Sequence, residues 1–335
     1  MGMNAVSVSL IQDLRPKILE RRERLQTAAV SMASDSATAS YVNELLAEVD
    51  ATLQRIENGT FGLCETCHDT IEAERLECNP LTRFCLDHLT GAQLRAHEED
   101  MELATKIQTR LLPAKDIVTR GWETHYRYRP AGVVSGDYCE IVGPADGKPL
   151  FFAVGDVAGK GVAASLLMTH LSAIFRSLLS LDLPLAEIMS RANRLFVEST
   201  PATHYATLAA GHTTENGLTL CNAGHCRPLL LRCDGTERID STGMPLGLFA
   251  DGRYTVRHIP LEPGDSLVLY SDGITEAQDA EGNDYEEERL VSSLRRHTGS
   301  DAKTLTDGAF GDVARFVGSG PQQDDMTLLV VRRCP

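Results

Sequence analysis

The stretch LFFAVGDVAGKG, residues Leu150–Gly161, joins a short apolar run directly to an acidic turn. Five apolar residues followed by glycine predict a buried β-strand that ends at Gly155-Asp156. A second apolar run, Ser266–Tyr270, leads in the same way into Ser271-Asp272-Gly273. Because each run ends in an aspartate, we expect carboxylates to gather at one edge of a β-structure.

Two more acidic motifs belong to the same pattern. One is Ser135-Gly136-Asp137, and the other is Asp324-Asp325-Met326-Thr327, which opens the last apolar run. Carboxylates that lie close together repel one another unless a cation neutralises them. The four motifs offer oxygen ligands without histidine or cysteine, which favours a hard ion such as Mg²⁺ or Mn²⁺. The sequence therefore predicts a metal centre with two ions.

The composition limits which classes of partner and which cell compartment we expect for this protein. The formal net charge of −15 argues against a broad surface for nucleic acid or anionic membrane, so neither partner is expected. Nine cysteines, an odd number, fit free or metal-bound thiols better than a disulfide framework, and we expect a cytoplasmic protein. No secretory signal is visible at Met1. The apolar stretch Val162–Leu183 contains His170 and Arg176, and it predicts a buried helix rather than a membrane span.

A chain of 335 residues is long enough for two or three domains. Apolar residues recur at helical spacing in Ile11–Ala29 and in Tyr41–Glu57. The small polar run Ser34–Ser40 predicts a turn between these two helices. We therefore expect a helical hairpin at residues 1–60 and a cysteine-rich module at residues 61–90.

A third helical segment precedes a region of short strands. Gly91–Leu112 places on one helical face the apolar residues Leu94, Met101, Ala104, Ile107 and Leu111. We expect this linker helix, residues 91–113, to couple the N-terminal module to a domain at residues 114–335. Within that domain, Glu140–Val157 predicts a hairpin that turns at residues 144–148. Helices are expected at Val162–Leu183, Leu185–Glu198, Tyr285–His297 and Ala302–Val317.

Two pairs of metal-ligand residues lie in the cysteine-rich module. Cys64 and Cys67 have C-x2-C spacing, and Cys85 and His88 have C-x2-H spacing, so each pair can present two ligands to one tetrahedral ion. Zinc is the usual occupant of a set of thiolates and imidazole. Scattered buried thiols are the alternative, and two regularly spaced pairs argue against it. We predict one zinc ion on these four residues, and we expect Cys78 to be a spare buried thiol.

This module resembles the DksA/TraR-type zinc finger. The resemblance rests on Arg55-Ile56-Glu57, Phe61-Gly62-Leu63-Cys64, Glu74-Arg75-Leu76, Pro80 and Cys85. Members of that family insert an acidic hairpin tip into the secondary channel of RNA polymerase. Here His88 replaces the usual fourth cysteine, and the tip carries only Asp35. The resemblance therefore implies the zinc fold, whereas RNA polymerase is not expected as a partner.

Residues from about Thr109 to Arg333 resemble the metal-dependent protein phosphatase (PPM) family, in its bacterial SpoIIE/RsbU-like branch. Five motifs occur in the family order: Ser135-Gly136-Asp137-Tyr138, Gly155–Gly161, Asn222-Ala223-Gly224-His225, Tyr270–Ala277 and Asp324-Asp325-Met326-Thr327. The resemblance implies an α+β fold, the α-β-β-α sandwich, with two Mn or Mg ions between the sheet edges. It also implies hydrolysis of phosphoserine or phosphothreonine in a protein by metal-activated water.

The same resemblance assigns the site residues. Metal binding and catalysis fall to Asp137, Asp156, Asp272 and Asp324, with Asp156 bridging both ions. The carbonyl of Val157 and the neighbouring Asp325 are further metal ligands.

The roles of several residues near these motifs can be interpreted in more than one way. Lys160 fits either a phosphate contact or a solvated lysine, and Gly155–Gly161 lacks the spacing of a P-loop. His225 is read as part of a structural turn. Glu276 is a candidate to orient water, whereas Glu140 is not expected to be a ligand.

The branch resemblance implies an anti-sigma-factor antagonist as the phosphoprotein substrate, in a partner-switching pathway. We expect the zinc module to gate the enzyme, with residues 91–113 available for a homodimer. The alternative is a zinc-finger regulator that binds RNA polymerase and carries an inactive phosphatase-like scaffold. The choice of Mn or Mg stays open, as does a structural or a sensory role for the zinc.

Overall fold

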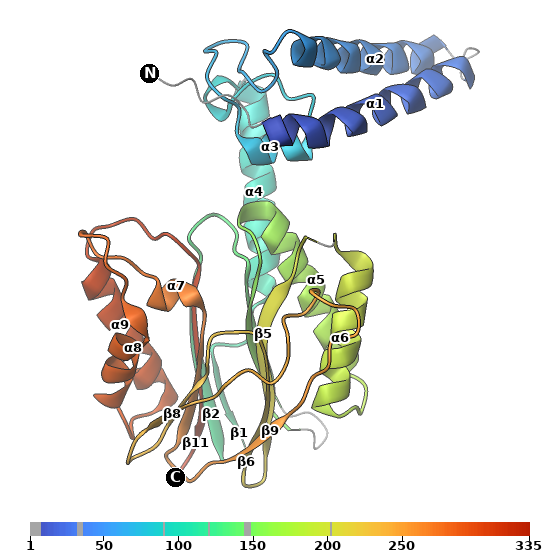
Figure 1. Ribbon diagram of the computed structural model, residues 1–335. Coiled ribbons are helices and arrows are strands. Elements are labelled where there is room, and N and C mark those ends of the chain that lie inside the picture. Colours follow the sequence, from blue (N-terminus) through green and yellow to red (C-terminus); the bar gives the residue numbers. More distant parts are fainter. Residues whose placement is uncertain (1–7, 32–35, 90, 120, 144–148, 202) are drawn as a thin grey trace. The chain divides into compact units, whose positions relative to one another are not determined.

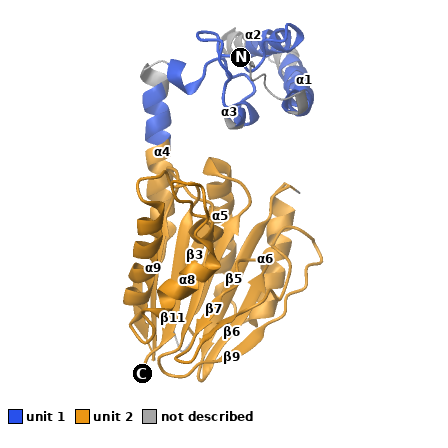
Figure 2. Cartoon of the chain, turned by 60° about the vertical axis from the view of Figure 1, so that its left-hand side comes forward, with its two compact units in different colours: residues 1–100 blue, residues 101–335 orange. Residues whose placement is uncertain are grey.

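The computed structural model describes residues 8–31, 36–89, 91–119, 121–143, 149–201 and 203–335. The chain forms two compact units, residues 1–100 and 101–335 (Figure 2). The boundary between the two units falls inside a helix, α4, which spans Gly91–Leu111. Each unit is described by itself below.

The N-terminal unit contains two long helices, a short helix and a 3-10 turn: α1 (Val8–Ser31), α2 (Ser36–Glu57), α3 (Ala73–Cys78) and η1 (Leu86–His88). The helices α1 and α2 form a hairpin (Figure 1). Leu14 and Ile18 of α1 and Val49 of α2 are buried in one core with Phe61 and Leu76. This small core joins the hairpin to the cysteine-rich module.

The predicted turn at Ser34–Ser40 is wrong in its second part. Helix α2 already begins at Ser36, so the residues that follow it are helical. Serine favours the start of a helix and alanine favours its interior, which explains why this small polar run is helical. Asp35, the acid expected at the hairpin tip, lies outside the described residues.

Two antiparallel sheets form the second unit. The first sheet has the order β1-β2-β11-β10-β7-β8, with β1 (Asp116–Thr119), β2 (Trp122–Arg129), β11 (Met326–Arg333), β10 (Ser266–Tyr270), β7 (Leu229–Leu231) and β8 (Thr236–Arg238). The second has the order β3-β4-β5-β6-β9, with β3 (Asp137–Val142), β4 (Phe151–Val157), β5 (Ala206–Thr214), β6 (Gly217–Ala223) and β9 (Arg257–Pro260). The turn of the predicted β3–β4 hairpin, residues 144–148, lies outside the described residues.

Helices cover the outer face of each sheet (Figure 1). They are α5 (Gly161–Leu179) and α6 (Leu185–Ser199) on the second sheet, and α8 (Glu286–Arg295) and α9 (Ala302–Val317) on the first. One apolar core lies between the two sheets, and one lies beneath each helix pair. The α-β-β-α sandwich expected from the sequence is therefore confirmed. At one end of this sandwich, loops that flank strands of both sheets can converge.

Helix α5 is, among the described residues, the helix long and apolar enough to cross a membrane by length and composition alone. Its Met168, Leu171 and Phe175 lie in the core beneath α6, as expected for a core helix of the sandwich.

The predicted apolar face of α4 is only partly correct. Leu94 and Ile107 are exposed, whereas the buried side chain on this part of the helix is Gln108. The Gln108 amide donates to the Ser135 carbonyl at 2.7 Å and accepts from the Ser135 amide at 3.0 Å. A paired polar contact therefore replaces the apolar packing that helical periodicity predicted, because a buried amide is stable when both ends are hydrogen-bonded.

Candidate metal centres

Five aspartates, here called the acid cluster, lie at the ends of strands from both sheets and are close enough to interact: Asp137, Asp156, Asp272, Asp324 and Asp325. Asp137 begins β3 and lies directly opposite Asp156 of β4. Directly opposed residues of antiparallel strands point to the same face, with Cβ atoms about 5 Å apart. The strand register alone therefore places two carboxylates side by side.

The residue before Asp137, Gly136, lies in a space with little room for a side chain. A Cβ atom at this position would lie 3.3 Å from both the Asp156 Oδ1 atom and the Val157 carbonyl oxygen, and 3.2 Å from the Ala164 Cβ atom. The missing side chain thus lets the backbone approach closely, and it leaves the two oxygens of residues 156 and 157 beside each other.

The other sheet supplies the remaining acids. Asp272 begins the short helix α7, Asp272–Thr275, directly after β10, and Asp324-Asp325 precede the neighbouring strand β11. A Cβ atom at Gly273 would collide with the Asp325 carbonyl oxygen. This glycine therefore allows the start of α7 to pack against the entry to β11, which brings both acidic motifs together.

Hydrogen bonds join the two sheets through the acids themselves. Ser271 Oγ donates to Asp137 Oδ2 at 2.8 Å, and Thr327 Oγ1 donates to the same oxygen. The amides of Ala131 and Gly136 donate to the two oxygens of Asp325, at 2.7 and 2.8 Å. Ser271 and Thr327 stand inside two of the acidic motifs, but the sequence did not indicate a role for either of them.

The electrostatics of the acid cluster favour a bound cation. Burial, then repulsion by Asp272 and Asp324, raises the pKa of Asp156 to about 7. Burial also raises the pKa of Asp272 and places that of Asp137 well above its usual range. Among the described residues, the ion pair that reaches the cluster joins Lys160 Nζ to Asp324 Oδ2 at 2.8 Å. One lysine cannot balance five carboxylates, so this all-oxygen donor set fits divalent Mg or Mn ions.

Four ligand atoms converge in the N-terminal unit, in what is here called the cysteine cluster: Cys64, Cys67, Cys85 and His88. All four ligand atoms lie within 4.8 Å of one another. Cys67 Sγ is 3.7 Å from Cys85 Sγ, and Cys85 Sγ is 3.2 Å from His88 Nδ1. The sequence pairs are thus brought to one point, as a single tetrahedral ion requires.

The thiol of Cys64 is prepared for metal binding. Burial acts to raise its pKa, but backbone hydrogen bonds from Cys67, Cys85 and Thr66 outweigh it and lower the pKa to about 6. A thiolate near neutral pH is the form that binds zinc. Cys78, in contrast, is exposed, so the prediction that it is a buried thiol is wrong. The short helix α3 places its last residue at the surface of the module.

His225 has a structural environment. Its Nδ1 atom lies 2.9 Å from Thr207 Oγ1, and its backbone amide donates to the Asn222 side chain at 2.9 Å. Burial lowers the pKa of His225 to about 4, which keeps the ring neutral. The Asn-Ala-Gly-His motif therefore builds a buried turn next to β5, as the sequence interpretation held.

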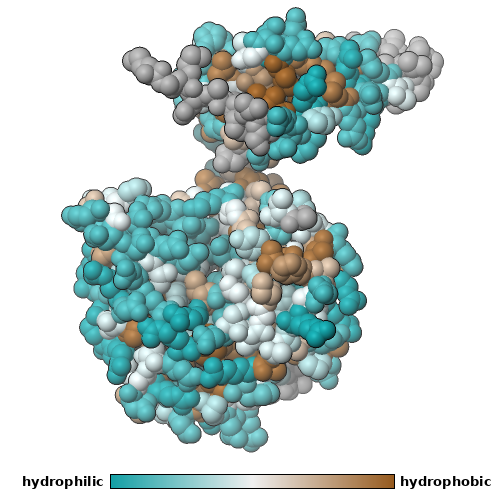
Figure 3. Space-filling model, viewed as in Figure 1, coloured by the Kyte–Doolittle hydropathy of each residue, from teal (hydrophilic) through white to brown (hydrophobic). Residues whose placement is uncertain are grey.

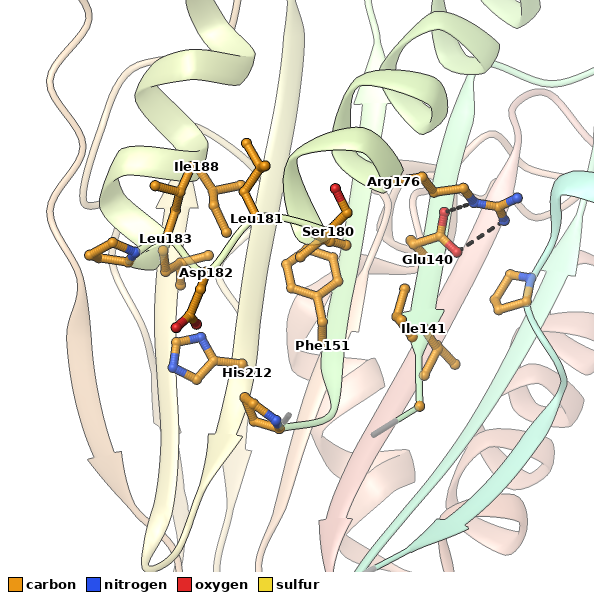
Figure 4. Close-up of a pocket in the computed structure, with 17 residues that line it drawn as sticks. Glu140, Ile141, Phe151, Arg176, Ser180, Leu181, Asp182, Leu183, Ile188 and His212 are labelled. Atoms are coloured by element: carbon orange, nitrogen blue, oxygen red, sulfur yellow. Dashed lines mark hydrogen bonds and ion pairs between the residues drawn. The ribbon is translucent and has the colours of Figure 1, made fainter. Parts of the chain in front are cut away.

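Glu140 points away from the acid cluster and lines a separate cavity of about 1030 Å³ (Figure 4). Arg176 Nε donates to Glu140 Oε2 at 2.9 Å, and Arg176 Nη2 donates to Glu140 Oε1 at 3.1 Å. Arg176 Nη2 also donates to the Leu111 carbonyl at 2.6 Å, which ties the end of α4 to α5. Glu140 is therefore part of a structural ion pair and not a metal ligand.

We expect Arg176→Met to destabilise the second unit by about 2 kcal/mol, because it leaves the buried Glu140 carboxylate unpaired. The expected loss is smaller than for a fully buried ion pair, because the Arg176 side chain is partly exposed. Burial already raises the pKa of Glu140 above its ordinary 4.5. The folded state therefore favours protonated Glu140, and stability is lost as the pH rises above 4.5. Without Arg176 that pKa rises further, so urea unfolding should show a larger loss at pH 8 than at pH 5. Equal losses at both pH values, or no recovery in Glu140→Gln/Arg176→Met, would contradict this account.

Both the N-terminal unit and the second unit are similar to known proteins. A family profile described as Stage II sporulation protein E (SpoIIE) matches residues 146–334, and a prokaryotic dksA/traR C4-type zinc finger profile matches residues 59–87. The phosphoserine phosphatase RsbU of Bacillus subtilis is 28% identical over 249 residues, which cover 73% of this chain and 73% of RsbU. The SiaA-PP2C domain of Pseudomonas aeruginosa shares the fold, with a TM-score of 0.62 and 20% identity over 72% of this chain and 99% of that one. A structure of the RsbU and RsbW domains of Rv1364c from Mycobacterium tuberculosis gives a TM-score of 0.56 and 26% identity over 65% of this chain and 62% of that one.

Proposed function

Because the chain belongs to the Stage II sporulation protein E (SpoIIE) family, we propose that it is a protein serine/threonine phosphatase. The observation that carries the proposal is the acid cluster, in which buried carboxylates from both sheets repel one another around Asp156. A site of this kind gains stability from divalent cations and from the phosphate that such cations bind. The relative RsbU, named a phosphoserine phosphatase, agrees with this activity.

We assign two Mn or Mg ions to the acid cluster and one zinc ion to the cysteine cluster. Asp137, Asp156, Asp272, Asp324 and the Val157 carbonyl would hold the Mn or Mg ions. When bound, the two cations would neutralise the phosphate and lower the pKa of water so that it can attack phosphorus.

The chain's own residues then hold this arrangement in place. Ser271 and Thr327 fix the orientation of Asp137 through its Oδ2 atom. Asp325, which we also propose as a ligand, accepts a backbone amide on each of its oxygens and fixes the loop before β3. Lys160, paired with Asp324, is placed to turn toward a phosphate once the cations balance the acids.

The substrate we propose is a phosphorylated anti-sigma-factor antagonist, in a cytoplasmic partner-switching pathway, with the zinc module gating the enzyme. The solved RsbU–RsbW relative is consistent with this pathway. The domains would be a helical hairpin (1–60), a zinc finger (61–90), a regulatory helix (91–113) and the phosphatase (114–335). Leu103 and Ile107 are exposed on α4, which supports a homodimer through that helix.

One observation favours a different function. The zinc-finger profile matches residues 59–87, and the relatives that share this region include the RNA polymerase-binding transcription factor DksA of Escherichia coli. RNA polymerase binding would make the second unit an inactive scaffold. The intact acid cluster argues against that alternative, because an inactive scaffold has no need for mutually repelling carboxylates.

Turnover of p-nitrophenyl phosphate and of a phosphoserine peptide tests the proposal. We expect hydrolysis by the full chain with Mn or Mg, loss of turnover after dialysis against EDTA, and recovery when Mn is restored. Absence of turnover with every divalent ion would overturn the proposal, and RNA polymerase binding would then be the function to measure.

A further inference from the structure

Two loops beside Asp156 expose a group of large apolar side chains, here called the apolar platform: Tyr205, Met244, Leu248 and Phe249. Their exposed fractions are 39%, 50%, 41% and 52%. Hydrophobic surface gathers on this face of the second unit in Figure 3, where the loop between β8 and β9 crosses in front of α5 and α6 in Figure 1. Contiguous exposed apolar side chains of this size mark interaction sites more often than isolated ones do.

The platform is held rigidly from below. Leu246, between Met244 and Leu248, exchanges two backbone hydrogen bonds of 2.8 Å with Ala206. The buried Asn193 of α6 accepts from the Gly247 amide at 2.9 Å and donates to the Phe249 carbonyl at 2.8 Å. A loop fixed at these points loses little conformational freedom on binding, so the contacts that it makes are not offset by an ordering cost.

The platform is continuous with the acid cluster. The Tyr205 carbonyl accepts from the Ala158 amide at 2.9 Å, and Ala158 is two residues beyond Asp156. Thr207, two residues after Tyr205, lies directly opposite Asp156 in the β4–β5 register. A chain with its phosphorylated residue at the acid cluster would therefore pass over or beside these apolar side chains.

Charge alone cannot supply the affinity for such a substrate. The chain has a net charge of −15, and a phosphorylated segment is itself negative, so the long-range field is repulsive. Burial of apolar surface does not depend on charge, so it can favour binding despite this repulsion. One large buried side chain contributes enough to change the affinity about tenfold. The platform offers this term at the place where the substrate must lie.

We propose that the apolar platform binds apolar side chains that flank the phosphorylated residue of the protein substrate, and so selects the substrate. This inference rests on the proposed phosphatase function. The proposed ligand of the platform is a segment of a phosphoprotein. The alternative ligand, which the experiment must exclude, is a second copy of this chain.

Two synthetic phosphoserine peptides test it, identical except that one carries Leu and Phe beside the phosphoserine and the other carries Ser and Gly. We expect the wild-type enzyme with Mn to have a kcat/KM about tenfold higher for the apolar peptide. Phe249→Ser and Met244→Ser should remove most of that preference and leave turnover of p-nitrophenyl phosphate unchanged. Val118→Ser is the control and should keep the preference, because Val118 is an even more exposed apolar residue, on β1 at the end of the sheet away from the acid cluster.

The possible outcomes are distinct. Loss of p-nitrophenyl phosphate turnover in wild type would reject the phosphatase itself, whereas normal turnover without any peptide preference would reject only the platform. A parallel fall of both substrates in Phe249→Ser would mean that the loop shapes the metal centre and does not select substrates. A lower molecular mass in solution for Phe249→Ser, with peptide preference retained, would assign the surface to contact between two copies and overturn the inference.

Discussion

Asp156→Asn should reduce Mn-dependent turnover of p-nitrophenyl phosphate by a factor of about 10³ or more, equivalent to about 4 kcal/mol of transition-state stabilisation. Asparagine keeps the shape of the side chain but removes the charge at the centre of the acid cluster. Asp156 lies opposite Asp137, and Asp272, Asp324 and Asp325 are close enough to repel it. A neutral group in this position weakens the affinity for both proposed cations, so part of the loss should be recovered at high Mn concentration.

The same substitution should stabilise the metal-free second unit. The pKa of Asp156 rises from its ordinary 3.8 to about 7 on folding, so the folded state favours the protonated acid. Stability from this group is therefore present below about pH 4 and is lost as the pH rises to 7, a loss of up to about 4 kcal/mol. Asparagine does not titrate and avoids that loss.

One tryptophan makes this measurable. Trp122, the chain's single tryptophan, lies in β2, so its fluorescence reports urea unfolding of the second unit. After EDTA dialysis at pH 8, we expect Asp156→Asn to unfold at a higher urea concentration than wild type. Asp234→Asn, an exposed aspartate in the β7–β8 turn, is the matched control and should change neither activity nor stability. An inactive variant that is also less stable would indicate misfolding and would not support the metal-site assignment.

Cys85→Ser should unfold the N-terminal unit. Structural zinc in small fingers binds with an apparent free energy of roughly 10–16 kcal/mol, which is comparable to or larger than the stability of a typical domain. The small core around Leu14 and Leu76 offers little to replace it. We expect the zinc content to fall from one ion per chain to none and the helical circular dichroism to decrease, while the Trp122 transition stays unchanged.

Cys78→Ser is the control for this experiment, because Cys78 is an exposed cysteine outside the cysteine cluster. It should retain zinc and helical content. The activity of Cys85→Ser then tests gating: a severalfold change in p-nitrophenyl phosphate turnover is expected if the zinc module controls the enzyme. Unchanged turnover would leave the zinc structural, and a shift of the Trp122 transition would contradict the separation into two units.

The sequence predicts the parts of this protein that are encoded locally. A strand that ends in Gly155-Asp156, and cysteines spaced for one turn, are short-range patterns, and both predict side chains that the structure brings together. The hydrogen bonds from Ser271 and Thr327 to Asp137 span 134 and 190 residues, and no local pattern signals them. Helical periodicity predicted α4 itself but only part of its buried face, because it counts apolar residues and does not anticipate that a glutamine becomes the buried contact.

The position of β11 has a consequence for when this protein can act during its synthesis. The strand lies between β2 and β10 in the first sheet, although it follows β10 by some fifty residues and β2 by far more. Thr327 at its start fixes Asp137, and Asp325 just before it holds the loop that leads into β3. A nascent chain that has not yet released β11 from the ribosome therefore lacks both the middle of one sheet and the support of its acids. We therefore expect a chain that lacks β11 to show no Mn-dependent turnover.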